Sequence, residues 1–226
     1  MPALSDRLLA WLGLDFGGIS LRNEALSAIA PSLFVGVRPR PDDVPALREA
    51  GITHVFSCLD AGALPKVAFL EGSFRVERFS LRDAMDADLT GALPAFFAFA
   101  EEASGGTLLV HCEAGVSRSA TLATALLMRR ERLSFLEAYR RLRTKRPGVL
   151  PNIGFASQLQ HFEATLRPGA RGTPSSLATY LREYCAAPVE LAVLDEMLLR
   201  HDDDAPRALQ AIFGGEIPRV VQGARR

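Results

Sequence analysis

The chain has 226 residues, of which 48% are hydrophobic and 23% are charged. This composition fits one well-packed domain with an extension and excludes a generally disordered chain. The 26 Lys and Arg residues balance the 26 Asp and Glu residues, which argues against nucleic acid as the main partner. Three scattered cysteines (Cys58, Cys112 and Cys185) exclude a disulfide scaffold, no metal-ligand spacing is present, and a reducing, cytoplasmic setting is expected.

The first half of the chain alternates between predicted helices and strands. Apolar spacing predicts a short packing helix in a helical lead-in of residues 1–29, with a membrane-surface anchor as the alternative. We expect neither a signal peptide nor a transmembrane segment, because no long apolar run is present. The elements predicted next are a strand at 33–37, a helix at 43–50, strands at 52–59 and 74–81, an acidic loop at 82–88 and an amphipathic helix from Leu93 to about Ala100.

In the second half, a short buried strand at 107–110 leads directly into His111 and Cys112. An apolar helix over 120–128 should be buried, a capping box opens another helix at Ser134, and Asn152 caps a third that ends near Leu166. This order predicts an α/β domain over residues 30–167, with helices on both faces of a sheet. Residues 168–226 are expected to form a linker and a helical extension of unknown role.

The chemistry is expected in the segment from His111 to Ser119. Thiolate is the nucleophilic form of cysteine, and thiols at helix N-termini ionise more readily than free thiols. Backbone N–H groups around such a cysteine form a concavity for an anion, and the guanidinium of Arg118 can bind two phosphate oxygens. We therefore expect a phosphate-binding loop that needs no metal or cofactor, in which Cys112 is followed by Glu113, Ala114, Gly115, Val116, Ser117 and Arg118.

This loop resembles the Cys-x5-Arg signature of the protein tyrosine phosphatases. Its fuller form, His-Cys-x-x-Gly-x-Ser-Arg-Ser, resembles the dual-specificity subgroup. The similarity continues at residues 32–36, 50–55 and 146–159, and covers about residues 30 to 166. It implies a central mixed sheet flanked by helices on both faces and a thiophosphate intermediate on Cys112. The alternative interpretation is a buried core thiol and an unrelated surface arginine.

The resemblance also implies roles for residues beside the loop. His111 hydrogen-bonds the loop from behind the cysteine, and a proton-transfer role is the alternative. Ser119 donates a hydrogen bond that helps the sulfur to depart, and Asn152 hydrogen-bonds the loop. Simple helix capping is the alternative for both Ser119 and Asn152.

A general acid must protonate the leaving oxygen. The family places this acid just after a strand, about thirty residues before the cysteine. Asp83 has that position, Asp86 is the reserve, and Asp88 better suits a helix cap.

Two further features have open interpretations. Cys58 ends a predicted strand, where it resembles the resolving cysteine of some lipid-acting relatives and could trap an oxidised Cys112, or could simply pack in the core. The arginine-rich stretch 129–146 is either a solvated helical face or a docking surface for acidic phosphoprotein or lipid.

The expected function is a cysteine-dependent phosphatase that acts on phosphotyrosine and, through a shallow pocket, on phosphoserine or phosphothreonine of phosphoprotein substrates. A phosphoinositide or phospholipid phosphatase is the alternative, although such relatives often carry Lys or Arg inside the loop and this one has none. An inactive phosphate-binding module is a further alternative, and the presence of both Cys112 and Arg118 argues against it. The sequence leaves the physiological substrate and the oligomeric state open.

Overall fold

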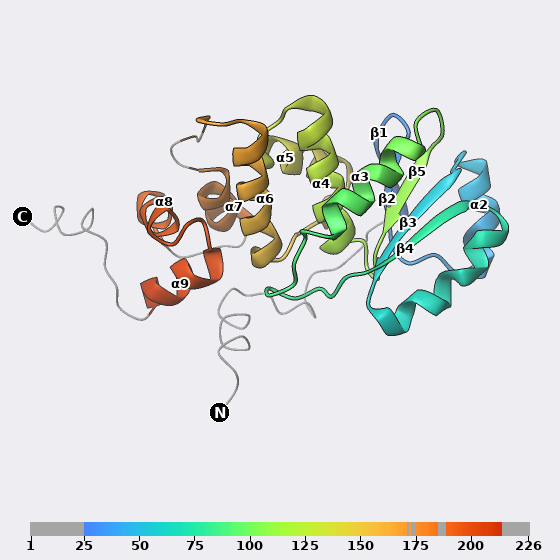
Figure 1. Cartoon of the computed structure of the whole chain (residues 1–226), viewed down its shortest axis with the longest axis horizontal. Coiled ribbons are helices and arrows are strands. Elements are labelled where there is room, and N and C mark those ends of the chain that lie inside the picture. The colour runs from blue at the N-terminus through green and yellow to red at the C-terminus, as the bar shows by residue number, and fades with distance from the viewer. Residues whose placement is uncertain (1–24, 171, 173–174, 185–188, 214–226) are drawn as a thin grey trace, which may run out of the picture.

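The structure is a computed structural model that describes residues 25–170, 172, 175–184 and 189–213 of the chain (Figure 1). Its centre is a five-stranded sheet with the order β1-β2-β5-β3-β4. β1 is antiparallel to β2 and the other neighbouring strands are parallel, so the sheet is mixed, as the resemblance implied. The strands are β1 (Leu26–Ala30), β2 (Leu33–Gly36), β3 (His54–Leu59), β4 (Arg75–Ser80) and β5 (Leu108–His111).

Helices cover both faces of this sheet (Figure 1). The larger apolar core lies between the sheet and α3, α4, α5 and α6. A smaller core around Leu47, Val67 and Leu70 lies on the other face, beneath α2 and η2. The helices are η1 (Pro41–Asp43), α2 (Val44–Glu49), η2 (Ala61–Gly72), α3 (Ala92–Glu102), α4 (Arg118–Glu131), α5 (Phe135–Lys145) and α6 (Ile153–Leu166).

The sheet begins earlier than the sequence predicted. Residues Leu26–Ala30 form β1, where a helical lead-in to residue 29 was expected, so that expectation is wrong from residue 26 onward. Five small and apolar residues give too short a pattern to distinguish strand from helix, and the pairing of Ala28 with Phe34 of β2 decides between them. The helix predicted near residues 4–11 lies outside the described residues.

The predicted strands and helices of the sheet domain are confirmed within a few residues, whereas β1 and the 3-10 helices η1 and η2 were not predicted. The capping box at the start of α5 is present, since the Ser134 and Glu137 side chains each accept a hydrogen bond from the other's backbone N–H. Asn152 caps α6, because its Oδ1 accepts a hydrogen bond from the Phe155 N–H at 2.9 Å. Among the described residues, no helix has the length and apolar character needed to cross a membrane.

Three helices follow the sheet domain and lie at the end of the molecule away from the sheet (Figure 1). Their apolar side chains, among them Leu194 and Met197, are buried in the same core as α4, α5 and α6. The Tyr180 ring packs against Phe135 and Tyr139, with centroid distances of 5.2 and 4.9 Å. The extension therefore shares its core with the sheet domain and consists of α7 (Ser176–Tyr184), α8 (Leu191–Arg200) and α9 (Ala205–Phe213).

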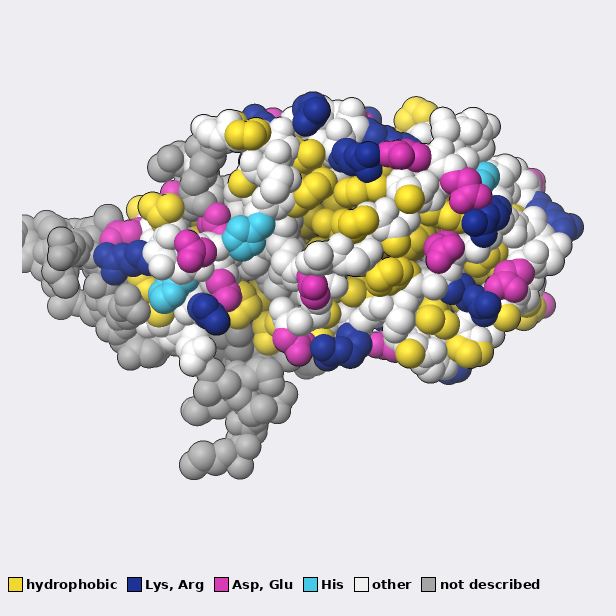
Figure 2. All heavy atoms as spheres, viewed as in Figure 1, with side chains coloured by type: hydrophobic (Ala, Val, Ile, Leu, Met, Phe, Trp, Pro, Cys, Tyr) yellow, Lys and Arg dark blue, Asp and Glu magenta, His cyan; other side chains and the backbone are white. Residues whose placement is uncertain are grey.

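The arginine-rich stretch 129–146 is engaged in contacts within the fold. Arg129 forms an ion pair with Glu101 at 2.5 Å, and Arg140 forms one with Glu183 at 2.7 Å. On the face shown in Figure 2, basic and acidic side chains lie interleaved, without one dominant basic patch. These contacts favour the interpretation of the stretch as a solvated helical face.

Candidate active site

β5 and α4 hold the predicted phosphate-binding loop between them. β5 is buried along its whole length and ends at His111, and α4 begins at Arg118. The side chains at the two ends of the loop are buried, with Cys112 only 1% and Arg118 only 5% exposed. Ser119, in the first turn of α4, donates a hydrogen bond from Oγ to the Cys112 Sγ at 3.3 Å. The structure thus brings together three of the four residues that the sequence predicted to be catalytic, and the fourth, Asp83, is described below.

The carbonyl groups of the loop accept hydrogen bonds from the surrounding framework. With the carbonyls engaged outside, the loop can present its amide N–H groups to the inside, where they form a concavity for an anion. The donors are the Arg38 N–H to Glu113 (3.1 Å), the Arg146 guanidinium to Ala114 (3.5 Å) and Gly115 (2.8 Å), the Leu150 N–H to Val116 (2.9 Å) and the Thr121 N–H to Ser117 (2.8 Å).

Gly115 is required by both conformation and space. Its φ is +65°, in the left-handed region that L side chains rarely adopt. A Cβ at this position would lie 2.3 Å from the Arg146 Nη2 and 2.6 Å from the Gly36 carbonyl oxygen. Glycine therefore lets the loop approach β2 and Arg146 closely.

Arg146 is a supporting residue that the sequence analysis did not single out. It is 1% exposed and donates from Nε to the Gly115 carbonyl at 2.8 Å and from Nη1 to the Ser27 Oγ at 3.0 Å. It thereby ties the loop to β1. In the sequence, Arg146 is one of many arginines. The one feature that could have identified it as a supporting residue is its position at the start of segment 146–159, which resembles the family.

Arg118 is held beside Cys112 by hydrogen bonds from one of its three nitrogen atoms. Its Nη1 donates to the Asp60 Oδ2 at 3.0 Å and to the Leu81 carbonyl at 3.1 Å. Its buried Nε has no hydrogen-bond acceptor among the described residues, and an unsatisfied buried donor of this kind is costly unless an anion fills the site. Burial opposes the charge, but attraction from Cys112, Asp83 and Asp60 outweighs it and raises the pKa of Arg118.

Asp60 is a second residue that the sequence analysis missed. It follows β3 directly, and its carboxylate is 60% exposed while it pairs with Arg118. The C-terminal ends of parallel strands converge at one edge of a sheet, which is the reasoning that singled out Cys58. Asp60 lies two residues after Cys58, so the same reasoning would have placed Asp60 near the loop.

His111 lies behind the loop with both ring nitrogens engaged. Its Nδ1 is 3.3 Å from the Cys112 carbonyl and its Nε2 is 2.7 Å from the Ser57 Oγ. Because a carbonyl only accepts, Nδ1 carries the proton and Nε2 accepts from the serine hydroxyl. Burial lowers the pKa of His111 to about 4, so the ring is neutral at neutral pH. This geometry favours support of the loop over proton transfer.

Among the three candidate acids Asp83, Asp86 and Asp88, Asp83 is the one that contacts the phosphate-binding loop. Its Oδ1 accepts hydrogen bonds from the Ser117 Oγ at 2.7 Å and from the Asn152 Nδ2 at 2.9 Å. Its Oδ2 lies 3.6 Å from the Arg118 Nε. The Asn152 N–H also donates to the Ser117 Oγ at 3.1 Å, so Asn152 both caps α6 and hydrogen-bonds the loop.

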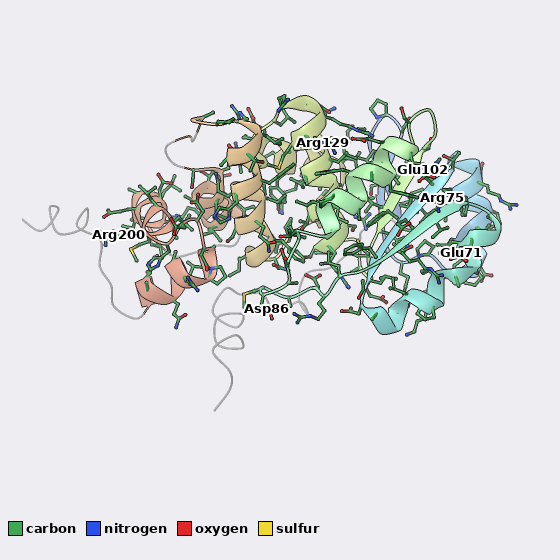
Figure 3. The ribbon with its side chains drawn as sticks, viewed as in Figure 1. Glu71, Arg75, Asp86, Glu102, Arg129 and Arg200 are labelled. Atoms are coloured by element: carbon green, nitrogen blue, oxygen red, sulfur yellow. The ribbon has the colours of Figure 1, made fainter. Side chains whose placement is uncertain are left out.

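The other two carboxylates of the acidic loop face elsewhere. Asp86, labelled in Figure 3 on the segment between β4 and α3, is 76% exposed and pairs with Arg82 at 3.3 Å. Asp88 accepts hydrogen bonds from the N–H and the hydroxyl of Thr90, and these bonds lower its pKa. Asp88 therefore holds the turn before α3, and neither residue contacts the phosphate-binding loop through a described hydrogen bond.

α6 also fixes the course of the loop that carries Asp83. The Gln158 side chain accepts from the Leu89 N–H at 2.8 Å and donates to the Ala87 carbonyl at 2.9 Å. A Cβ at Gly154 would lie 2.0 Å from the Met85 carbonyl oxygen, so glycine is needed for this close approach. The acidic loop is therefore anchored to α6 beyond Asp83.

Cys58 lies beside the reaction centre in a buried position. Its Sγ donates to the His111 carbonyl at 3.0 Å, and it is 0% exposed. Ser57 pairs with His111 in the parallel register, and Cys58 and Cys112 are the residues that follow this pair. Burial, and then the neighbouring Cys112, raise the pKa of Cys58 well above its usual value.

The chain is similar to known phosphatases over the sheet domain. The family model for "Dual specificity phosphatase, catalytic domain" matches residues 33–165. Dual specificity protein phosphatase 1B of Arabidopsis thaliana is 35% identical over 147 residues, which cover 64% of this chain and 86% of the relative. Human dual specificity protein phosphatase 6 is 33% identical over 67% of this chain, and the match spans 41% of that longer protein.

Solved structures agree with this similarity. The crystal structure of human DUSP28 is 34% identical, has a TM-score of 0.56, and the match covers 64% of this chain and 96% of that one. The human tyrosine phosphatase-like serine/threonine/tyrosine-interacting protein is 28% identical, with a TM-score of 0.59, over 62% of this chain and 96% of that one. The chain therefore belongs to the dual specificity phosphatase family of the protein tyrosine phosphatase superfamily.

Proposed function

We propose that this chain hydrolyses phosphomonoesters of phosphotyrosine, phosphoserine and phosphothreonine in proteins through a phosphocysteine intermediate. One observation carries the proposal. The Cys112 sulfur, held by Ser119, lies beside a buried Arg118 whose Nε lacks an acceptor, in a loop whose carbonyls are engaged outside. This arrangement leaves amide donors and guanidinium donors for the oxygens of a phosphate group.

The reaction would proceed in two steps. The Cys112 thiolate attacks phosphorus, the bond to the leaving oxygen breaks, and Asp83 gives its proton to that oxygen. Water then attacks phosphorus, the bond to sulfur breaks, and the Asp83 carboxylate takes up the proton of the water, which releases inorganic phosphate and restores both groups. The Ser119 hydroxyl, 3.3 Å from the sulfur, stabilises the departing thiolate. Arg118 and the loop amides hold the phosphoryl oxygens in both steps, so positioning and fixed charges supply most of the rate.

Phosphoproteins are the proposed substrate class. The relatives reported above are named as dual specificity protein phosphatases. The five residues between Cys112 and Arg118 contain no base, and the one charged residue among them, Glu113, forms an ion pair with Arg38 at 3.0 Å. A headgroup with several phosphates would find no added positive charge inside this loop, which supports protein over phosphoinositide substrates.

The proposed enzyme needs no metal and works in the cytoplasm. Arg118 and the loop amides supply the positive field that a metal ion would otherwise provide. A cysteine nucleophile requires a reduced thiol, and both described cysteines are free thiols. A reducing compartment keeps them in that state.

A turnover and trapping experiment tests the proposed function. Phosphotyrosine and phosphothreonine peptides, an inositol phosphate and glycerophosphate would be compared side by side, and acid-quenched samples would be searched by mass spectrometry for phosphate on the Cys112 peptide. We expect turnover of the peptides and a phosphorylated Cys112 that is absent from Cys112→Ser. Preferred hydrolysis of the inositol phosphate, or turnover without a cysteine adduct, would contradict the proposal.

A further inference from the structure

Helices α7, α8 and α9 lie outside the segment 33–165 that the family model matches, yet α7 and α9 contact α6, the helix that Asn152 caps. The Leu177 N–H donates to the Gln160 Oε1 at 2.9 Å, and the Ala205 N–H donates to the Ser157 Oγ at 2.9 Å. Both acceptors belong to α6. The extension therefore supports the helix whose first turn reaches the active site.

We infer that Tyr180 of α7 is a positioning residue for Asp83, acting through the peptide group between Pro151 and Asn152. The inference rests on the proposed role of Asp83 as the general acid. The Tyr180 hydroxyl donates to the Pro151 carbonyl at 2.5 Å. The N–H of the same peptide group, on Asn152, donates to the Ser117 Oγ at 3.1 Å. The Ser117 hydroxyl in turn donates to the Asp83 Oδ1 at 2.7 Å.

The geometry makes this series of hydrogen bonds continuous. A peptide group is planar and trans, so its C=O and N–H point in opposite directions, one toward Tyr180 and the other toward Ser117. A serine hydroxyl can accept one hydrogen bond while it donates another. The position of the Asn152 N–H therefore fixes the direction in which the Ser117 hydroxyl donates to Asp83. Every bond in the series has the same donor-to-acceptor sense, and such bonds polarise and strengthen one another.

Tyr180 is fixed firmly enough to set this orientation. Its side chain is fully buried, and its ring packs between Phe135 and Tyr139.

The orientation of the Pro151–Asn152 peptide group affects two hydrogen bonds to the Asp83 Oδ1. One comes from the Ser117 hydroxyl, which accepts from the N–H of this peptide group. The other comes from the Asn152 Nδ2, at 2.9 Å. Oδ1 accepts two hydrogen bonds, whereas Oδ2 accepts none in the described structure and lies 3.6 Å from the Arg118 Nε. Oδ2 is therefore the oxygen that we assign to carry the proton for the leaving group.

The test compares two phosphomonoesters that differ in their need for an acid. Phenyl phosphate has a poor leaving group that requires a proton, whereas p-nitrophenyl phosphate has a leaving group that departs without one. In the full chain, Tyr180→Phe keeps the ring and removes one hydroxyl. We expect it to lower kcat for phenyl phosphate by about three- to tenfold, the scale of one hydrogen bond, with less than about twofold loss for p-nitrophenyl phosphate.

Thr179→Val is the matched control, since it removes a neighbouring hydroxyl of α7 that donates to the Ser175 carbonyl within the extension. It should leave the ratio of the two rates unchanged. A second variant, Tyr180→Met, replaces the ring by a flexible apolar side chain and should shift the ratio in the same direction. Circular dichroism and thermal unfolding establish that each variant is folded.

A double-mutant cycle separates this inference from the proposed function. If Tyr180 acts through Asp83, Tyr180→Phe will not change the rate ratio further in an Asp83→Asn background. If Asp83→Asn itself leaves phenyl phosphate turnover unchanged, the assignment of the general acid fails. If Asp83→Asn shifts the ratio but Tyr180→Phe does not, or lowers both rates equally as a loss of packing would, the role of Tyr180 is overturned.

Discussion

The Nε of Arg146 donates a hydrogen bond to the carbonyl oxygen of Gly115 at 2.8 Å, across 31 positions of sequence. This bond holds the middle of the phosphate-binding loop in a conformation that only glycine adopts readily, with φ of +65°. The conformation of the loop therefore depends on close contact between Gly115 and Arg146, and a substitution at Gly115 tests this dependence.

Gly115→Ala should abolish turnover and phosphate binding together. The added Cβ would lie within 2.6 Å of the Gly36 carbonyl oxygen and closer still to Arg146, so the loop cannot keep its course. Isothermal titration calorimetry with vanadate measures the binding, because it does not depend on turnover. Gly62→Ala is the control, because a Cβ at Gly62 meets nothing within 4 Å. Retention of wild-type vanadate affinity in Gly115→Ala would show that the loop tolerates the side chain.

Cys112→Ser and Arg118→Ala should separate chemistry from binding. A serine hydroxyl ionises far less readily than a thiol, so Cys112→Ser should lose turnover while it still binds a phosphopeptide through the intact loop. Arg118→Ala removes the donors that hold phosphate and should lose both. Isothermal titration calorimetry with a phosphotyrosine peptide measures the difference. Substantial turnover by the serine variant would rule out the covalent mechanism.

Asp83→Asn should lower kcat on phosphopeptides by roughly 10²–10⁴-fold, the usual range for loss of a general acid. The amide can still accept from Ser117 and Asn152, so the local structure should persist. The loss should be smaller for p-nitrophenyl phosphate, and the basic limb of the pH profile should flatten. Asp86→Asn is the control, since that carboxylate is exposed and pairs with Arg82. A larger effect at Asp86 than at Asp83 would reverse the assignment.

Folding stability should fall as the pH is lowered from about 6.5 toward 4, because of His111. The unfolded chain takes up a proton near the ordinary histidine pKa of 6.5, whereas burial lowers the pKa in the folded chain to about 4. The unfolded state therefore binds more protons in this window, and between pH 7.5 and pH 5 the linkage amounts to about 2 kcal/mol.

Urea unfolding at the two pH values measures this loss of stability. His111→Gln should lack the histidine contribution, while His54→Gln should retain it. Equal pH dependence in the wild type and in His111→Gln would show that His111 does not remain neutral in the fold.

Mild peroxide should produce a disulfide between Cys58 and Cys112. The register of β3 and β5 ends at the pair Ser57 and His111, so the two cysteines are the residues that come next, and the Cys58 Sγ lies 3.0 Å from the His111 carbonyl oxygen. Neighbouring strands are about 4.8 Å apart, a spacing that permits a disulfide. Since burial raises the pKa of Cys58, its thiolate fraction and the trapping rate should increase with pH. Peptide mapping detects the bond, and Cys58→Ser should make inactivation harder to reverse with dithiothreitol. Equal recovery of wild type, Cys58→Ser and Cys185→Ser would leave Cys58 as a packing residue.

The sequence predicted the elements whose pattern is local. The buried run before Cys112, the apolar helix after Arg118 and the capping box at Ser134 each depend on neighbouring residues, and the structure contains all three. β1 was missed because its strand character comes from pairing with β2.

The supporting residues of the site were harder to predict for a related reason. Arg146 and Asp60 act through contacts with residues distant in the chain, and such contacts leave no periodic pattern. Asp83 was found because family resemblance supplied its spacing from Cys112. The sequence could not show which of its two carboxylate oxygens is held by neighbours.

The burial of Tyr180 against Phe135 and Tyr139 has a consequence for what counts as a folding unit. A fragment trimmed to residues 33–165 would lose β1 on one side and three helices on the other. It would expose a bare sheet edge and an aromatic surface to water, both of which favour aggregation. We therefore expect the span that folds on its own to be longer than the segment matched by the family model, and the shortest soluble, cooperative unit to include residues 25–213.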